Sequence, residues 1–123
     1  MFKTVCLLKR RDGMSMKDFM DYYESHHRKI GEKVLPKGVY YVRRFLHGVP
    51  NPVTGELTEL EFDCLTEMWF ESKEAFEVAM EALSEPSVAA EIAEDEEKLF
   101  DRSKIRFCTI EEHKSAQPEA NVA

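Results

Sequence analysis

The fold is decided by one long helical stretch, MSMKDFMDYYESHHRKIGEKV, at residues 14–34. Ser15 is its expected N-cap and Asp18 follows three residues later, as in a capping box, while Met14 and Phe19 have the spacing of a hydrophobic staple. Apolar residues then recur every three or four positions, which places them on one helical face. This face contains Met16, Met20, Tyr23, His27, Ile30 and Val34.

Four β-prone segments flank this helix, at residues 1–9, 39–46, 61–70 and 104–111. A second helix is predicted to begin after Ser72 and to be interrupted at Pro86. A further helix follows over residues 92–100, with the acidic run 94–97 on a solvated face. The order β-α-β-β-α(α)-β is that of a ferredoxin-like α+β fold, in which a four-stranded antiparallel sheet carries its helices on one face.

The two faces of the strand at residues 61–70 differ in composition. One face is nearly all apolar and should lie under the helices: Phe62, Cys64, Thr66, Met68 and Phe70. The other face mixes charged and apolar residues: Asp63, Leu65, Glu67 and Trp69. A lone monomer would expose the apolar members of this second set, so we predict a homodimer formed through the open face of the sheet.

The composition sets limits on the class of protein. The 123 residues, 43% of them hydrophobic, suffice for one domain, which we expect over residues 1–113 with a disordered tail over 114–123. The net charge of −7 argues against nucleic acid or an anionic membrane as a partner. Three cysteines without a C-x-x-C pair predict a cytoplasmic protein in which Cys6, Cys64 and Cys108 are reduced and buried.

The four histidines do not have the spacing of a metal site. No two of them lie four residues apart, and the adjacent pair His26 and His27 must point in different directions on a helix. His27 lies at the centre of the apolar face and His26 at its edge. We therefore expect no metal ion.

Three stretches of the chain resemble the EthD family of the dimeric α+β barrel superfamily. They are LKRRDGMSMKDF at residues 8–19, DYYESHH at residues 21–27 and FDCLTEMWF at residues 62–70. With the last strand they cover the chain from about residue 2 to residue 113. The resemblance implies two subunits whose sheets face each other as a barrel, and usually no cofactor. Members include accessory proteins of ether degradation as well as small dehydratases, cyclases and decarboxylases.

His27 is the strongest candidate for a catalytic residue. An imidazole titrates near neutrality, so it can take a proton from carbon or oxygen and return it in one turnover. Tyr23, one turn earlier on the same face, could donate a hydrogen bond to a developing oxyanion. Each residue also has a purely structural interpretation as part of the core. The substrate pocket is predicted between the first helix and the sheet, and is lined by Thr4, Cys6, Tyr41, Arg43, Cys64 and Thr66.

Four further residues are possible members of the site: Asp63, Glu67, Trp69 and His26. A pair between His27 and Asp63 or Glu67 is chemically attractive. Strand alternation nevertheless directs both carboxylates to the open face, where we expect interfacial charges paired with Lys9, Arg43 or Arg44. Trp69 is better interpreted as packing in the dimer core than as a platform for substrate.

These observations favour a cofactor-independent lyase or isomerase that acts on a small apolar compound, aromatic or polyketide-like, by general acid/base catalysis at His27. Two alternatives stay open. Under the first alternative, the chain is a non-enzymatic accessory or ligand-binding dimer of a degradation pathway. Under the second, it is a cofactorless quinol-forming monooxygenase of the kind found in a sister family.

Overall fold

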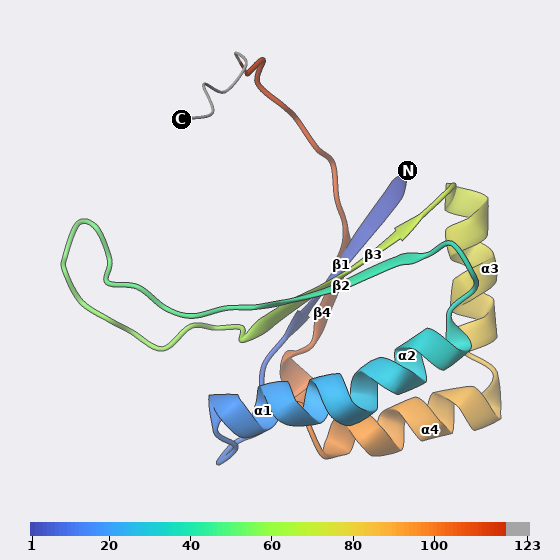
Figure 1. Cartoon of the computed structure of the whole chain (residues 1–123), viewed down its shortest axis with the longest axis horizontal. Coiled ribbons are helices and arrows are strands. Elements are labelled where there is room, and N and C mark those ends of the chain that lie inside the picture. Colours follow the sequence, from blue (N-terminus) through green and yellow to red (C-terminus); the bar gives the residue numbers. More distant parts are fainter. Residues whose placement is uncertain (118–123) are drawn as a thin grey trace.

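The computed structural model describes residues 1–117, and its helices and strands follow the predicted β-α-β-β-α(α)-β order (Figure 1). The sheet contains β1 (Phe2–Leu8), β2 (Tyr40–Phe45), β3 (Cys64–Phe70) and β4 (Arg106–Thr109). The helical elements are α1 (Met16–Tyr22), the π-helical turn η1 (Tyr23–His27), α2 (Arg28–Val34), α3 (Lys73–Leu83), α4 (Pro86–Glu97) and the short 3-10 turn η2 (Arg102–Lys104).

The sheet has the strand order β2-β3-β1-β4, and every neighbouring pair is antiparallel. Figure 1 shows the helices on one side of the sheet, with α1, η1 and α2 running alongside α4, while the opposite face of the sheet carries no helix. The α+β ferredoxin-like fold class is therefore confirmed. Within residues 1–117, no helix combines the length and the low polarity that crossing a lipid bilayer requires.

The helices begin where their capping residues predict. The backbone N–H of Asp18 donates to Ser15 Oγ at 3.1 Å, and that of Ala75 donates to Ser72 Oγ at 3.0 Å. Pro86 occupies the first turn of α4, where its missing N–H costs nothing. These local signals located the starts of α1 and α3 in the sequence. The helix expected over residues 92–100 instead begins six residues earlier, at Pro86, and ends at Glu97.

The regular helix predicted over residues 14–34 is interrupted at its middle by η1. The backbone N–H of Arg28 donates to the carbonyl of Tyr23, five residues earlier, which is the π-helical pattern. Both ends of this turn are fixed from outside the helix, because Tyr23 bonds to Thr66 and His27 bonds to Asp95. Such turns occur frequently at functional sites.

The core lies between the sheet and the helices. Its buried members are Leu8, Phe19, Tyr23, Cys64, Leu99 and Phe100. Phe19 packs edge-to-face against Tyr23, Phe45 and Phe100, with ring centroids 5.9–6.1 Å apart. On β3 the residues Cys64, Thr66 and Phe70 are buried on the helix side, which confirms the predicted assignment of its two faces.

Three further local predictions differ from the structure. β3 begins at Cys64 rather than at residue 61, although the backbone of Asp63 still bonds to those of Leu8 and Leu46 while its side chain accepts from the Arg10 N–H. Cys108 is exposed rather than buried, since it lies on the edge strand β4 opposite Val5, on the face without helices. The third concerns the acidic run at residues 94–97, which was expected on a solvated face but contains the buried Asp95. Of the tail predicted over 114–123, residues 118–123 lie outside the described residues.

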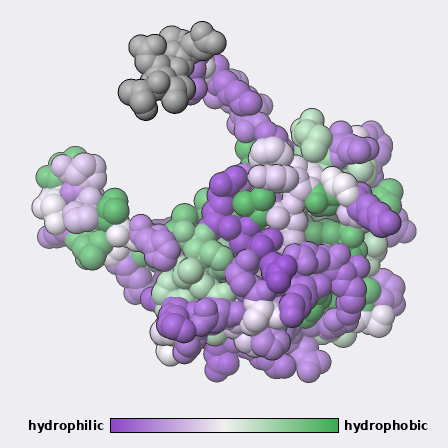
Figure 2. Space-filling model, viewed as in Figure 1, coloured by the Kyte–Doolittle hydropathy of each residue, from purple (hydrophilic) through white to green (hydrophobic). Residues whose placement is uncertain are grey.

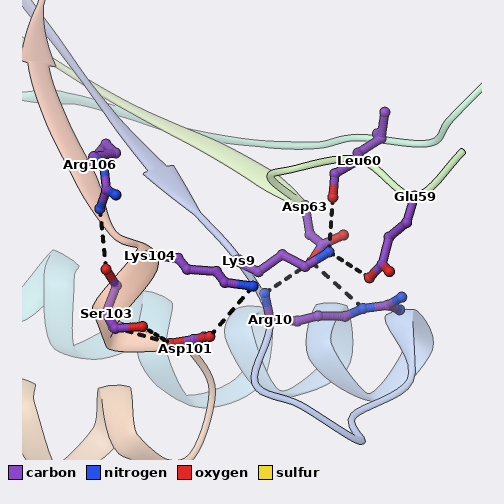
Figure 3. A network of polar contacts seen from close by, with 9 residues as sticks. All are labelled: Lys9, Arg10, Glu59, Leu60, Asp63, Asp101, Ser103, Lys104 and Arg106. Carbon is purple, nitrogen blue, oxygen red and sulfur yellow. Dashed lines mark hydrogen bonds and ion pairs between the residues drawn. The ribbon is translucent and has the colours of Figure 1, made fainter.

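Residues 46–63 form an irregular arm that projects from the body between β2 and β3 (Figure 1). Figure 2 shows the arm standing clear of the body with hydrophobic surface on it, and its Val49 and Val53 are 79% and 90% exposed. Figure 3 shows how the base of the arm is attached. Lys9 Nζ donates to Glu59 Oε1 at 2.8 Å and to the carbonyl of Leu60 at 2.9 Å, and it lies 3.4 Å from Asp63 Oδ2.

Candidate active site

An apolar cavity of about 190 Å³ lies between η1, α2, α4 and the helix-covered face of the sheet. Drug-sized ligands usually occupy about 300–1,000 Å³, whereas an engineered cavity of about 150 Å³ binds benzene. The size and the lining therefore suit a compound of about one ring. The lining residues with polar atoms are Cys6, Tyr23, His27, Tyr41, Thr66 and Glu96.

His27 reaches the cavity from the end of η1 and is oriented by Asp95 of α4. Its Nδ1 lies 2.8 Å from Asp95 Oδ2, and the two side chains are only 12% and 10% exposed. An ionised carboxylate accepts hydrogen bonds and cannot donate them, so Nδ1 carries the proton and donates it to Asp95. Nε2 then keeps its lone pair, and no residue within 1–117 donates a hydrogen bond to it. This is the arrangement of a general base held by a carboxylate.

Asp95 is held on its other oxygen by Tyr22. The phenol of Tyr22 donates to Asp95 Oδ1, and burial together with this hydrogen bond raises the pKa of Tyr22 to about 12. Tyr22 therefore stays a proton donor over the whole neutral range. Asp95 thus receives one hydrogen bond on each oxygen, which fixes the plane of its carboxylate and with it the direction of the His27 ring.

A group of three hydroxyls lies across the cavity from α4. Tyr23 Oη lies 2.5 Å from Thr66 Oγ1, and Tyr41 lines the cavity beside them. Burial raises the pKa of both tyrosines, so both phenols stay protonated and can donate to an oxygen of a ligand. Gly31 of α2 makes room for the Tyr41 ring, because a Cβ at Gly31 would lie 2.9 Å from its Oη and Cζ atoms.

Glu96 follows Asp95 on α4 and also lines the cavity. Its carboxyl makes no hydrogen bond within the described part of the chain and lies 3.6 Å from Arg102 Nε, beyond hydrogen-bond distance. Burial raises the pKa of Glu96, although the nearby His27 and Arg102 act in the opposite direction. Two adjacent carboxyls on one helix therefore differ in environment: Asp95 has two hydrogen-bond donors and Glu96 has none.

The pocket residues predicted from the sequence divide into two groups. Cys6, Tyr41 and Thr66 line the cavity, and burial raises the pKa of Cys6 to about 12, which keeps its thiol protonated. The structure does not bring Thr4, Cys64 or Arg43 to the cavity. The Thr4 hydroxyl donates to the carbonyl of Met68, and Cys64 is fully buried. The guanidinium of Arg43 binds both oxygens of Glu24 at 2.9 Å, so it is not directed inward as an anchor for a ligand.

The four possible members of the site lie outside the cavity. Asp63 accepts from the backbone N–H of Arg10 at 3.0 Å, and Glu67 accepts from Arg44 Nε at 2.5 Å. Trp69 packs against Tyr40 with ring centroids 4.4 Å apart, on the open face of the sheet. His26 stacks on Tyr22, and its Nδ1 lies 2.8 Å from Ser25 Oγ. The carboxylate partner of His27 is therefore neither Asp63 nor Glu67.

The sequence analysis missed Asp95 and Glu96, which it assigned to a solvated acidic run. Only Glu94 and Glu97 of that run are exposed. A signal was present, because Ile92, Asp95, Glu96 and Leu99 follow one another at helical spacing and so share one face of α4. Within residues 1–117, no three His, Cys, Asp or Glu side chains are grouped closely enough to hold a metal ion.

Comparison with known structures supports the fold. An EthD family protein from Bacillus halodurans aligns with a TM-score of 0.60 at 18% identity, over 92% of this chain and 100% of its own. A protein from Arabidopsis thaliana aligns with a TM-score of 0.54 at 19% identity, over 95% of this chain and 100% of its own. A protein from Agrobacterium tumefaciens aligns with a TM-score of 0.53 at 10% identity, over 93% and 95%.

No curated protein sequence matches this chain. The family comparison is more specific, because the EthD domain matches residues 11–103, which include the helical stretch with His27 and the α4 helix with Asp95 and Glu96. The chain therefore belongs to the EthD domain family.

Proposed function

We propose that this protein is a cofactor-independent enzyme of the lyase or isomerase type, which acts on a small apolar carbonyl compound of aromatic or polyketide-like character. The observation that carries the proposal is the hydrogen bond between His27 Nδ1 and Asp95, which leaves Nε2 as a free base beside an apolar cavity. Water can satisfy both ring nitrogens of a surface histidine, whereas the largely buried His27 has its Nδ1 held by a carboxylate.

The first chemical step follows from these groups. His27 Nε2 takes a proton from the carbon next to the substrate carbonyl, and the electron pair of the broken C–H bond moves onto the carbonyl oxygen. The resulting enolate oxygen carries the negative charge. A phenol of Tyr23 or Tyr41 donates a hydrogen bond to this oxygen, and both phenols remain protonated because burial raises their pKa.

We further propose that the protein is a homodimer formed through the open face of the sheet. That face carries Val5 and Leu7 of β1 beside Leu65 and Trp69 of β3, as the registers of the strands require. Among its charged members, Arg44 binds Glu67 and Lys3 binds Glu112, whereas Arg106 donates only to backbone carbonyls. The two ion pairs lower the electrostatic cost of burying this face against a second copy.

The test uses cyclohex-3-enone, a single-ring ketone that carries an acidic C–H between its carbonyl and its double bond. In D₂O, the wild-type protein is expected to accelerate exchange of this hydrogen, followed by proton NMR. His27→Ala should abolish the acceleration, a loss of about 10²-fold or more. His26→Ala is the matched control, because this neighbouring histidine lies outside the cavity, and it should leave the rate unchanged.

Two other outcomes are informative. Equal exchange rates in wild type and His27→Ala would remove His27 from the mechanism. A ketone that raises the melting temperature of the wild-type protein without exchanging its hydrogen would favour the alternative, a ligand-binding protein in which His27 only packs. The ring of His27, edge-to-face with Tyr23 and Phe100, is compatible with that packing role, which makes the comparison necessary.

A further inference from the structure

Glu96 is a partly buried carboxyl that neither the fold nor the orientation of His27 requires. It lines the cavity, its side chain is 19% exposed, and no described residue donates a hydrogen bond to its oxygens. Placing a carboxyl in an apolar cavity without a donor is unfavourable. Groups retained in such places are frequent members of active sites.

Arg102 does not account for this placement. Its guanidinium donates to Glu97 Oε1 at 3.1 Å, whereas its Nε lies 3.6 Å from Glu96. A surface ion pair of this kind contributes little to stability, and Glu97 already provides one. The ion pair with Arg102 therefore does not explain why an acidic side chain lies at position 96.

We propose that Glu96 is the general acid of this site, the group that delivers a proton to the substrate after His27 has removed one. The inference rests on the proposed function, since it assigns the second proton transfer of the same reaction. The two groups reach the cavity from different elements, His27 from η1 and Glu96 from α4. They are therefore able to act on different atoms of one bound ligand.

The environment of Glu96 supports an acid rather than a second base. Burial raises its pKa, so its carboxyl keeps a proton to higher pH than an ordinary glutamic acid. The charged and titratable groups that face it are His27, Arg102, Asp95, Glu97 and Cys6. Asp95 differs from Glu96 because it accepts hydrogen bonds from His27 and Tyr22. Such a difference in environment commonly gives two neighbouring carboxyls different roles in catalysis.

The reaction balances for a β,γ-unsaturated ketone without any further reactant. His27 Nε2 takes the proton from the α-carbon, and the electron pair forms a dienolate. Glu96 then gives its proton to the γ-carbon, and the double bond moves into conjugation with the carbonyl. His27 is left as an imidazolium and Glu96 as a carboxylate, and the proton passes back from one to the other through solvent. No atom is gained or lost by the substrate.

Cyclohex-3-enone tests this assignment, because its dienolate has two fates. When the proton on His27 exchanges with D₂O and a deuteron returns to the α-carbon, the substrate shows deuterium exchange, while transfer to the γ-carbon gives cyclohex-2-enone. In Glu96→Gln, the ratio of isomerisation to exchange should fall by about 10²-fold, with exchange itself maintained. Glu97→Gln is the matched control, because this carboxylate is adjacent, binds Arg102 and lies outside the cavity.

The wild-type protein provides a second measurement that needs no variant. Its ratio of isomerisation to exchange should fall as pH rises through the raised pKa of Glu96, towards the low value of Glu96→Gln. A Glu96→Gln protein with the wild-type ratio, or a wild-type ratio that does not change with pH, overturns the assignment and leaves His27 as the base. A wild-type protein that exchanges without isomerising also overturns it. If neither reaction occurs, the proposed function itself fails.

Discussion

Asp95 of α4 accepts a hydrogen bond from His27 of η1 at 2.8 Å, although 68 residues separate the two in the chain. The contact joins η1 to α4, which lie side by side over the same face of the sheet (Figure 1), and it lies at the edge of an apolar cavity that both elements line. It decides which nitrogen of His27 is free. Most of what the site can do follows from this contact, so most of the predictions depend on it.

Asp95→Asn should reduce base catalysis by about 10²-fold or more without unfolding the protein. A carboxylate accepts from Tyr22 and His27 at once, whereas an amide has one oxygen and one NH₂ group. If the NH₂ group faces Nδ1, the imidazole must carry its proton on Nε2 and cannot act as a base. The measurement is the exchange rate of cyclohex-3-enone, with thermal denaturation as the control for folding. An unchanged rate would contradict the positioning role of Asp95.

Glu96→Gln should make the protein more stable at neutral pH, even though it removes an acidic group from an active site. Because the folded-state pKa of Glu96 is raised, its contribution to stability is present below the unfolded pKa and lost as pH rises through the folded pKa. The side-chain amide of Glu96→Gln stays neutral at every pH, so the variant does not undergo this loss of stability. Urea denaturation of both proteins over a series of pH values should therefore show a stability difference that grows from acid to neutral pH. A difference that shrinks with pH would be inconsistent with the burial of Glu96.

The three thiols should differ in reactivity towards a disulfide reagent such as DTNB. Burial raises the pKa of Cys6 to about 12 and that of Cys64 to about 11, so both should react slowly. Cys108 is exposed on the open face and should react first. In a dimer formed through that face, Cys108 is protected at high protein concentration, and Leu65→Asp should restore both its reactivity and a monomeric elution volume. Equal reactivity of Cys108 at all concentrations would contradict the proposed interface.

Gly31→Ala should reduce turnover and ligand binding with a modest loss of stability. The new Cβ would meet the Tyr41 ring at 2.9 Å, and the displaced ring must move into the cavity. Overpacking costs about 1–3 kcal/mol and alanine in a helix gains about 1 kcal/mol over glycine, so the net loss of stability should be about 0–2 kcal/mol. Binding of cyclohex-3-enone and thermal denaturation measure the two quantities separately. Tight binding in the variant would show that Tyr41 does not border the ligand.

Lys9→Met should destabilise the protein by about 1–3 kcal/mol and make the arm more sensitive to proteases. The change removes two hydrogen bonds at the base of the arm and leaves Asp63 with one cation fewer (Figure 3). Glu59→Gln is the control, since Glu59 is largely exposed and its loss should have a smaller effect. Urea denaturation and limited proteolysis provide the two readouts. If the protease cleaves Lys9→Met no faster than Glu59→Gln, the contacts of Lys9 do not hold the arm.

The sequence located the elements of the fold because each one has a local signal. Ser15 and Ser72 mark the starts of α1 and α3 through capping. Pro86 predicted an interruption, whereas in the structure it opens α4, where its missing N–H costs nothing. Alternation along β3 assigned its two faces. Lys9 was among the expected partners of Asp63, but the burial of Asp63 and its contacts with Arg10 were not predictable, because they depend on the way in which the end of β1 meets the start of β3.

The sequence predicted the site residues of the first helical stretch but not those of α4. The apolar spacing around His27 and Tyr23 identified the residues that the first helical stretch contributes. The contribution of α4 was hidden, because a run of four acidic residues has the composition of a solvated surface. Helical spacing with Ile92 indicates which two members of the run share an inward face, but the contact of Asp95 with His27 of η1 is tertiary and has no signal in the sequence. Arg43 illustrates the same limit, because its pairing with Glu24 cannot be inferred from its own strand.

The central claim is that Asp95 holds the proton of His27 on Nδ1 and leaves Nε2 free as the base. Long-range ¹⁵N–¹H NMR at about pH 8, where an imidazole is normally neutral, identifies the protonated nitrogen directly. We expect the His27 ring of the wild-type protein to show a protonated Nδ1 and a bare Nε2, and Asp95→Asn to lose this preference. A wild-type His27 with its proton on Nε2 would contradict the claim, because neither the base nor its orientation by Asp95 would then exist.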